Sequence, residues 1–299
     1  MIAGPTASGK TGLAILLANK LNAEIISVDS RQCYRLLDIG TAKPTKEELE
    51  AVPHHNISVL DPDEEDSVAN FKKRADRTTE EILSRGKKVI YCGGSTLHLQ
   101  SLIKPLDDIP SADPQHVEKL QSIANEKGVE ILFEQLKKVD PDYAKKMDGL
   151  NRQRIIRALD VWQQTGKPFS SFHSENPIEP PEDMAVFALN HPRPKLHQRI
   201  SQRTDRMFEL GFMEEVKQIL QMGYDPGLQS LQTVGYRQAV QYLRGEISEE
   251  KMIKDIKTAT RRYAKRQITW LRRWPFVIWL NMTEMNKESA IQEIFTKLD

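Results

Sequence analysis

The residues Gly4–Thr11 are the part of this 299-residue sequence with the clearest chemical meaning, because they match the pattern G-x-x-x-x-G-K-[ST] in full. Glycines in this pattern let backbone N–H groups turn inward around phosphate oxygens. The lysine adds a positive charge, and the final hydroxyl, that of Thr11, can hold Mg²⁺. The pattern predicts a phosphate-binding loop of the following residues: Gly4, Pro5, Thr6, Ala7, Ser8, Gly9, Lys10 and Thr11.

An acidic residue, Asp29, follows the next expected strand at 24–28. Ligands of open parallel sheets bind beyond the carboxyl ends of the strands, so Asp29 is expected near the phosphate-binding loop. A turn or helix-capping role is the simpler alternative. The expected strand at 88–92 ends in Gly93-Gly94-Ser95, without the acid that helps NTP hydrolases hold a metal. Two enzyme classes stay open at this point: a kinase for a small molecule, and a transferase that uses the loop for a diphosphate.

The elements that must position these residues alternate along the chain. Strands are expected at 24–28, 56–60, 88–92, 185–190 and 276–280, and helices at 10–21, 67–85, 95–103, 193–222, 235–244, 248–272 and 286–298. This alternation predicts an α/β fold, with a P-loop NTPase-like parallel sheet flanked by helices.

One stretch of the chain departs from this alternation and shows helical patterns alone. These patterns occur at 114–127, 128–138, 140–147 and 151–165, and prolines stand on both sides of the stretch. We therefore expect a catalytic core of residues 1–109 and 188–299, interrupted by an inserted all-helical subdomain of residues 110–187.

The composition limits the class of protein. Hydrophobic residues make up 39% and charged residues 28%, which is typical of a soluble globular chain. No apolar run reaches the ~18–20 residues that a membrane helix needs, and the N-terminus does not read as a secretory leader. The two cysteines are far apart in the sequence, and the adjacent His54 and His55 would point to opposite sides of a strand. We expect a cytoplasmic protein that makes no membrane contact and has no cysteine-based zinc site.

The formal net charge of +1 is an average over unlike parts of the chain. Residues 188–299 carry 19 basic and 13 acidic side chains, and within them residues 254–273 carry eight basic and one acidic. Binding to a phosphate backbone depends on local charge clusters, so the small total does not exclude nucleic acid. A solvated cationic helix face remains the alternative for 254–273.

Eight sequence blocks, in unbroken order, resemble the bacterial type of the tRNA dimethylallyltransferase family, also called tRNA isopentenyltransferases. The blocks are 4–11, 27–34, 38–44, 93–95, 153–159, 165–168, 233–238 and 264–267. Ser95 stands where the family usually has Thr, His98 where Tyr is more usual, and Arg262 where Gln is common. These departures concern the detail of the prenyl pocket and the charge of the last basic helix.

The resemblance implies a reaction and its catalytic residues. A dimethylallyl group would move from dimethylallyl diphosphate to N6 of adenosine 37, in the anticodon loop of tRNAs that read codons beginning with U, with Mg²⁺ as cofactor. Asp29 corresponds to the family's general base, and Arg203 to an arginine that holds the diphosphate; Ser95 keeps a hydroxyl beside them. Such loops also commonly bind ATP, and a monomer seated on a tRNA anticodon stem-loop is the implied working form.

The resemblance also implies a tRNA-binding set, which spreads over four segments of the chain. The members are Ser30, Arg31, Gln32, Gln153, Arg154, Arg157, Gln232, Thr233, Gly235, Tyr236, Arg237, Lys265 and Arg266. Two rival hypotheses remain: a kinase for a small metabolite, and an RNA-binding module with a vestigial nucleotide site. Transfer of label from dimethylallyl diphosphate into tRNA would separate all three.

Overall fold

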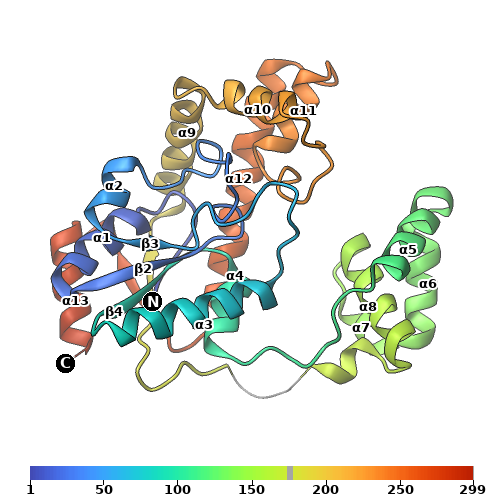
Figure 1. The fold of residues 1–299 in the computed structure, drawn as a ribbon, viewed down its shortest axis with the longest axis horizontal. Coiled ribbons are helices and arrows are strands. Elements are labelled where there is room, and N and C mark those ends of the chain that lie inside the picture. Colours follow the sequence, from blue (N-terminus) through green and yellow to red (C-terminus); the bar gives the residue numbers. More distant parts are fainter. Residues whose placement is uncertain (174–177, 299) are drawn as a thin grey trace. The chain divides into compact units, whose positions relative to one another are not determined.

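A parallel sheet forms the centre of the larger of two units in the computed structural model, which describes residues 1–173 and 178–298 (Figure 1). Within these residues the sheet has six strands in the order β3-β2-β4-β1-β5-β6, and every neighbouring pair is parallel. The strands are β1 (Ile2–Ala3), β2 (Ala23–Val28), β3 (His54–His55), β4 (Lys88–Gly93), β5 (Phe187–Asn190) and β6 (Ile278–Asn281). The predicted α/β class is confirmed.

Helices cover both faces of this sheet. Apolar side chains of α1 (Lys10–Leu21) and α13 (Lys287–Leu298) pack on one face, against residues such as Ile25 and Leu280. The other face is covered by α3 (Val68–Ser84), α4 (Thr96–Ile103) and the end of α12 (Glu249–Leu271), whose residues pack against Ile26 and Ala188. The carboxyl ends of β1, β2 and β4 therefore open toward one edge, where the phosphate-binding loop begins.

A third group of helices builds a separate apolar cluster in the same unit. It consists of α9 (Arg193–Glu209), α10 (Phe212–Gln221), α11 (Tyr236–Leu243) and the first half of α12, packed on the loop after β2 through residues such as Tyr34 and Leu37. The predicted single helix at 193–222 is wrong. It breaks at Gly211, whose φ of 93° is left-handed and starts a new helix axis.

The predicted strand at 56–60 is also wrong. The strand lies two residues earlier, where His54 and His55 pair with Ile25 and Ile26. Asn56 and Ser58 have positive φ angles of 58° and 52°, so the chain cannot stay extended through them. A short helix that the sequence did not predict, α2 (Lys46–Ala51), precedes this strand and is capped by Thr45 and Glu48.

The inserted unit is helical, and its bounds are Pro105–Pro177. It contains α5 (Pro114–Lys127), α6 (Val129–Val139), α7 (Pro141–Lys146), α8 (Arg152–Thr165) and the short 3₁₀ helix Phe169–Phe172, around a core of its own. The predicted bounds 110–187 are too late at both ends. Phe187 belongs to β5 and pairs with β1 and β6, so the chain has returned to the sheet before that point.

Two classes of element are absent from the described residues. No helix among them is long and apolar enough to cross a membrane. Nor does that part of the chain bring together three or more His, Cys, Asp or Glu side chains that could hold a metal ion.

Candidate active site at the phosphate-binding loop

The phosphate-binding loop connects β1 to α1, as its sequence pattern predicts. Gly9 caps α1 with a φ of 96°, and Ala7 has a φ of 62°, so the backbone curls around a small concave space. At Gly4 an added Cβ would lie 3.2 Å from the backbone N and O of Leu189, which explains the need for glycine there. Successive N–H groups in such a curl, next to a helix N-terminus, form a site for anions.

Two half-buried cations, Lys10 and Arg203, lie at this loop. Lys10 donates from Nζ to the Pro5 carbonyl at 2.8 Å, and Arg203 donates from Nη1 to Thr6 Oγ1 at 2.9 Å. Burial is the main reason that the pKa of Lys10 falls to about 8; Cys92 and Asp29 oppose this shift, and Arg203 contributes to it. Burial also lowers the pKa of Arg203. A bound anion would offset the cost of burying both charges.

Residues from β5 and α9 hold the loop from outside. Arg199 donates from Nε to the Ala7 carbonyl at 2.7 Å, and His191 Nε2 lies 2.9 Å from the Ser8 carbonyl. Ser8 Oγ is buried and has no hydrogen-bond partner among the described residues. The sequence predicted Arg203 near the loop, but it gave no local signal for Arg199 or His191.

Gln267 is the contact between the loop and the Gly93-Gly94-Ser95 segment. Its Oε1 accepts from the Thr6 N–H at 2.8 Å, and its Nε2 donates to the Gly94 carbonyl at 2.8 Å. The side chain is 2% exposed, and a Cβ on Gly94 would lie 2.3 Å from Nε2. Sequence reasoning took Lys265 and Arg266 from this block and missed Gln267.

Asp29 lies at the carboxyl end of β2 and closes a turn. Its Oδ1 accepts from the backbone N–H of Arg31 at 2.8 Å and of Gln32 at 3.3 Å. Among the described residues, its other oxygen, Oδ2, has no hydrogen-bond partner. The capping alternative is therefore correct for one oxygen, while the second oxygen is left available to a ligand.

The hydroxyl of Ser95 lies beside this carboxylate turn. It accepts from the Ser30 N–H at 3.0 Å and lies 3.4 Å from Ser30 Oγ. Tyr263 lies close to Asp29 and Ser95. Burial and the charge of Asp29 raise the pKa of Tyr263 to about 12. These contacts join β2, β4 and α12 at one point.

A cavity of about 370 Å³ opens over these groups. Its wall contains nine of the predicted site residues: Thr6, Asp29, Ser30, Arg31, Arg203, Gln232, Thr233, Arg237 and Arg266. Tyr263, Thr41 and Thr260 also line it and were not predicted. The structure thus brings the phosphate-binding loop, the carboxylate and a basic rim into one cavity.

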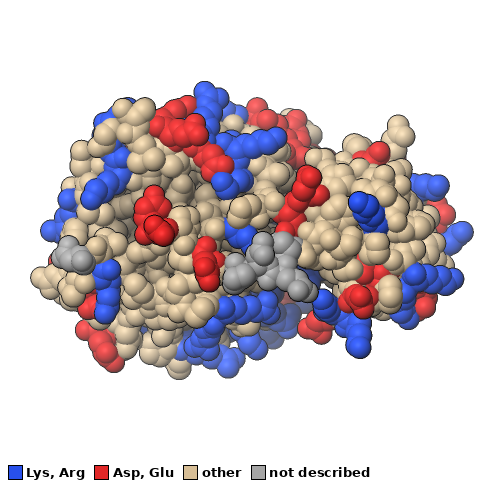
Figure 2. All heavy atoms as spheres, turned by 90° about the horizontal axis from the view of Figure 1, so that it is seen from below, with Lys and Arg blue, Asp and Glu red and all other residues tan. Residues whose placement is uncertain are grey.

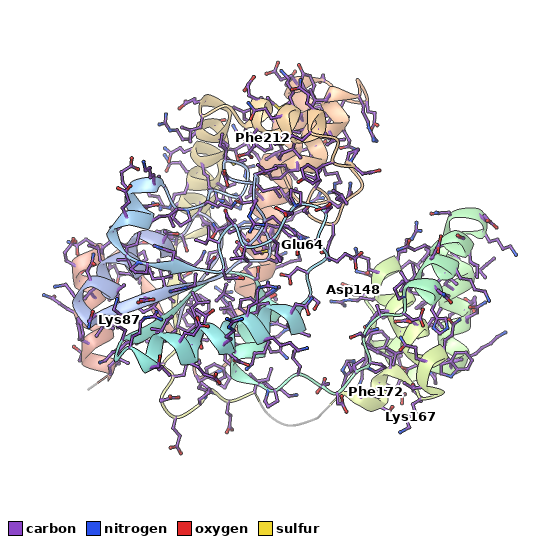
Figure 3. The ribbon with its side chains drawn as sticks, viewed as in Figure 1. Glu64, Lys87, Asp148, Lys167, Phe172 and Phe212 are labelled. Carbon is purple, nitrogen blue, oxygen red and sulfur yellow. The ribbon has the colours of Figure 1, made fainter. Side chains whose placement is uncertain are left out.

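Three members of the predicted tRNA-binding set are engaged within the protein. Gln32 accepts from Ser27 Oγ at 2.9 Å and donates to the carbonyls of Thr41 and Ala42. Tyr236 is fully buried, Gly235 before it is buried, and the Tyr236 ring packs edge-on against Phe212, a residue that is labelled in Figure 3. These residues position the cavity wall, and a direct contact to RNA stays a prediction for them.

The predicted residues of the inserted unit lie on α8. Gln153 and Arg154 are exposed. Arg157 is half-buried and donates to Asp160 at 2.7 Å and to the Pro110 carbonyl, so it also supports its own unit. Their contact with tRNA remains a prediction.

Glu215 of α10 holds the segment that forms one wall of the cavity. Its carboxylate accepts from the N–H groups of Asp38, Ile39 and Gly40 at 2.6–3.1 Å and from Tyr236 Oη at 2.6 Å. This charge, together with burial, raises the pKa of Tyr236 well above its usual value. The next residue of that segment, Thr41, accepts a bond from Arg203 Nη2 at 3.2 Å.

Replacement of Glu215 by Ala is expected to lower the free energy of unfolding by about 2–4 kcal/mol, because three N–H groups and a buried phenol lose a charged acceptor. Chemical denaturation measures this loss. Glu214→Ala is the matched control, since Glu214 only approaches Lys217 at 3.9 Å, and its change should stay within about 0.5 kcal/mol. Equal effects of the two variants would contradict the assigned role of Glu215.

Comparisons with known proteins give matches along nearly the whole chain. A sequence model of the family described as IPP transferase matches residues 32–274. A tRNA dimethylallyltransferase of Acetivibrio thermocellus is 44% identical over 97% of this chain and 94% of its own, and one of Salinibacter ruber is 41% identical over 100% and 92%.

Solved structures agree as well. A tRNA isopentenylpyrophosphate transferase from Bacillus halodurans superposes with a TM-score of 0.73 at 38% identity, covering 99% of this chain and 94% of that one. A eukaryotic dimethylallyltransferase, described as acting on tRNA, gives a TM-score of 0.80 at 28% identity and covers 100% and 79%.

Proposed function

The chain belongs to the IPP transferase family, and from this premise we propose that it transfers a dimethylallyl group to tRNA. The finer proposal is that the donor is dimethylallyl diphosphate and the acceptor is N6 of adenosine 37 in the anticodon loop of tRNAs that read codons beginning with U. The observation that carries it is the single cavity lined by Thr6 of the phosphate-binding loop, by Arg203 and by Asp29.

The diphosphate end of the donor fits the loop side of the cavity. As the C–O bond to the diphosphate breaks, negative charge grows on the departing oxygens. Lys10 and Arg203 lie at the loop, where they bond to the Pro5 carbonyl and to Thr6 Oγ1, so their charges are in place to stabilise those oxygens. Arg203 also ties Thr6 to Thr41, which keeps the cation in place.

The adenine end of the reaction fits Asp29. When N6 forms its bond to the dimethylallyl carbon, it must lose a proton, and Asp29 Oδ2 is the oxygen free to take it. The Arg31 and Gln32 N–H groups hold Oδ1 and so fix the direction of the carboxylate. A positioned base of this kind contributes about 10²–10⁴-fold to a rate. An adenine inside a stacked loop must first be extruded to reach it.

Mg²⁺ fits the donor set, because Thr11 offers a hydroxyl oxygen and this ion keeps several waters or phosphate oxygens of its own. Thr11 would hold it beside the loop, where the ion would add charge neutralisation at the diphosphate. The absence of a larger acidic cluster in the described residues is consistent with an ion bound mostly through substrate phosphates.

The decisive assay is incubation of the protein with an unmodified tRNA transcript, labelled dimethylallyl diphosphate and Mg²⁺. We expect label in the tRNA, located at adenosine 37 by nuclease digestion and mass spectrometry. A transcript with another base at position 37 is the control and should stay unlabelled. ATP-dependent phosphorylation of a small molecule, with no label in tRNA, would contradict the proposal and favour the kinase hypothesis.

The pKa of Lys10 gives a pH dependence with a defined sign. The lysine is charged below about pH 8 in the ligand-free protein, and the charged form binds an anion better. The affinity for inorganic diphosphate should therefore fall by about tenfold as the pH rises one unit through this value. Calorimetry measures this affinity at pH values from roughly 6.5 to roughly 9.5, a range that spans the titration of Lys10.

The control for this prediction is the variant Lys10→Met. Its pH profile reports the titration of the diphosphate itself without that of Lys10. The difference between the two pH profiles isolates the contribution of Lys10. Parallel profiles would show that Lys10 does not titrate in this range.

A further inference from the structure

A second cavity lies beside the phosphate-binding loop, between the start of α9 and the last turns of α12. Its volume is about 480 Å³. Five cationic side chains line it: Arg193, Arg261, Arg262, Lys265 and Arg272. Lys265 and Arg266 are neighbours in the sequence, but Arg266 lines the first cavity and Lys265 lines the second. Two faces of α12 therefore line two different cavities.

The cations of this cavity have no acidic partners among residues 1–173 and 178–298. None of the five forms an ion pair within the described part of the chain, and no carboxylate lines the cavity. The sequence explains this, because residues 184–204 and 256–283 contain no Asp or Glu. Elsewhere on the same helices some cations are paired, as in Lys251–Asp255 at 2.9 Å and Lys257–Asp205 at 2.5 Å.

The hydrogen-bond geometry of Arg261 is incomplete in the way expected of an anion ligand. Its Nη2 donates to Ser201 Oγ at 2.9 Å, which fixes the side chain, while its buried Nε has no partner in the described residues. The 17-residue helix α9 begins at Arg193 without a side-chain cap, so its N-terminal N–H groups add positive potential at the same wall. Arg261 and Arg193, with burial, lower the pKa of His197 between them.

An apolar contact separates this cavity from the candidate active site. Leu196, Ile200 and Ala264 pack together where α9 crosses α12. Leu196 and Ala264 face the second cavity, and Ile200 faces the first.

Lys and Arg also gather unevenly over the molecular face drawn in Figure 2, so the near-zero net charge hides local concentrations of one sign.

We propose that the cavity lined by Arg193, Arg261, Arg262, Lys265 and Arg272 is a second phosphate-binding site, distinct from the loop that holds the diphosphate. Arginine forks match phosphate oxygens in geometry as well as charge. Two sources present such phosphates: the backbone of the bound polynucleotide, and a free polyphosphate. The polynucleotide source rests on the proposed function, whereas the free polyphosphate does not.

The test compares two double variants that remove the same charge. Arg262→Gln/Arg272→Gln alters the cavity, and Arg244→Gln/Arg273→Gln is the matched control. Arg273 follows Arg272 directly and is exposed, but it stacks on Trp270 and does not line the cavity; Arg244 is exposed and approaches only Glu246. Thermal melts should show both variants folded, since all four side chains are at the surface.

Two measurements are made on each variant. The first is calorimetric binding of inorganic tripolyphosphate in a Lys10→Ala background, which weakens the loop site. The second is the affinity for an unmodified tRNA transcript as a function of salt. Loss of two phosphate contacts should lower the affinity for the affected ligand by about tenfold at low salt. For tRNA, it should also reduce the slope of log affinity against log salt concentration by about 2.

The outcomes identify the source or overturn the site. Weaker tRNA binding by the cavity variant than by the control identifies the polynucleotide backbone. Weaker tripolyphosphate binding alone identifies a free polyphosphate. Equal behaviour of the two variants in both measurements overturns the proposal. Label transfer by the unmodified protein is assayed in parallel, so that failure of the proposed function is visible separately from failure of this site.

Discussion

The variant Asp29→Asn is expected to reduce transfer of the dimethylallyl group by about 10²–10⁴-fold, while folding and diphosphate binding stay nearly intact. The amide keeps an oxygen that can accept from the Arg31 and Gln32 N–H groups, so the turn after β2 survives. It loses the basic second oxygen, which the reaction needs for the N6 proton. Single-turnover kinetics at saturating tRNA and donor measure the loss on the chemical step.

A comparison with Asp29→Ala separates the two roles of this side chain. Alanine removes both the base and the turn acceptor, so it should lose activity to a similar degree and also lose about 1–3 kcal/mol of stability. Diphosphate affinity, measured by calorimetry, should remain within a few-fold for the Asn variant. Retention of more than a tenth of the rate by Asp29→Asn would show that the carboxylate is structural only.

Features encoded in short stretches of sequence could be predicted. The phosphate-binding loop is one, because eight consecutive residues specify its curl, its cation and its helix start. Asp29 is another, because the end of a parallel strand is a place where ligands bind. Arg203 and the tRNA acceptor came from the family resemblance, since no local pattern around residue 203 points to a diphosphate.

Features that depend on tertiary contact could not be predicted in this way. Asn56 and Ser58 adopt left-handed backbone that ends β3 early. Asparagine favours this conformation more than most residues do, but its presence alone does not establish it. Glu215 reaches the loop at 38–40 from α10, far away in sequence. The two faces of α12 are a further case, because helical periodicity says which residues share a face but not which cavity that face will line.

Gln267 is the clearest example, and it yields the second large expected effect. The variant Gln267→Leu should lower kcat/KM for transfer by about 10²-fold, because misplacement of a catalytic group by about 1 Å has that effect. The side chain is the bridge from the Thr6 N–H to the Gly94 carbonyl, both at 2.8 Å. Its loss frees the phosphate-binding loop from the segment that carries Ser95.

The same variant should lose about 2–4 kcal/mol of stability, since leucine leaves a buried N–H and a buried carbonyl unpaired. Activity must therefore be measured well below the melting temperature, where the folded fraction is the same for both proteins. Lys254→Gln, at an exposed position of the same helix, is the control and should change neither quantity. A stability loss with unchanged kcat/KM would restrict Gln267 to a structural role.

A shorter amide tests whether the span of the side chain matters. Gln267→Asn keeps the donor and the acceptor but is one methylene shorter, so it cannot reach Thr6 and Gly94 together. If Gln267 acts by setting the distance between the loop and the Gly93-Gly94-Ser95 segment, Asn should resemble Leu in kcat/KM while losing less stability. Activity close to that of the unmodified protein would instead mean that any buried amide suffices, and that Arg199, Arg203 and His191 are enough to place the loop.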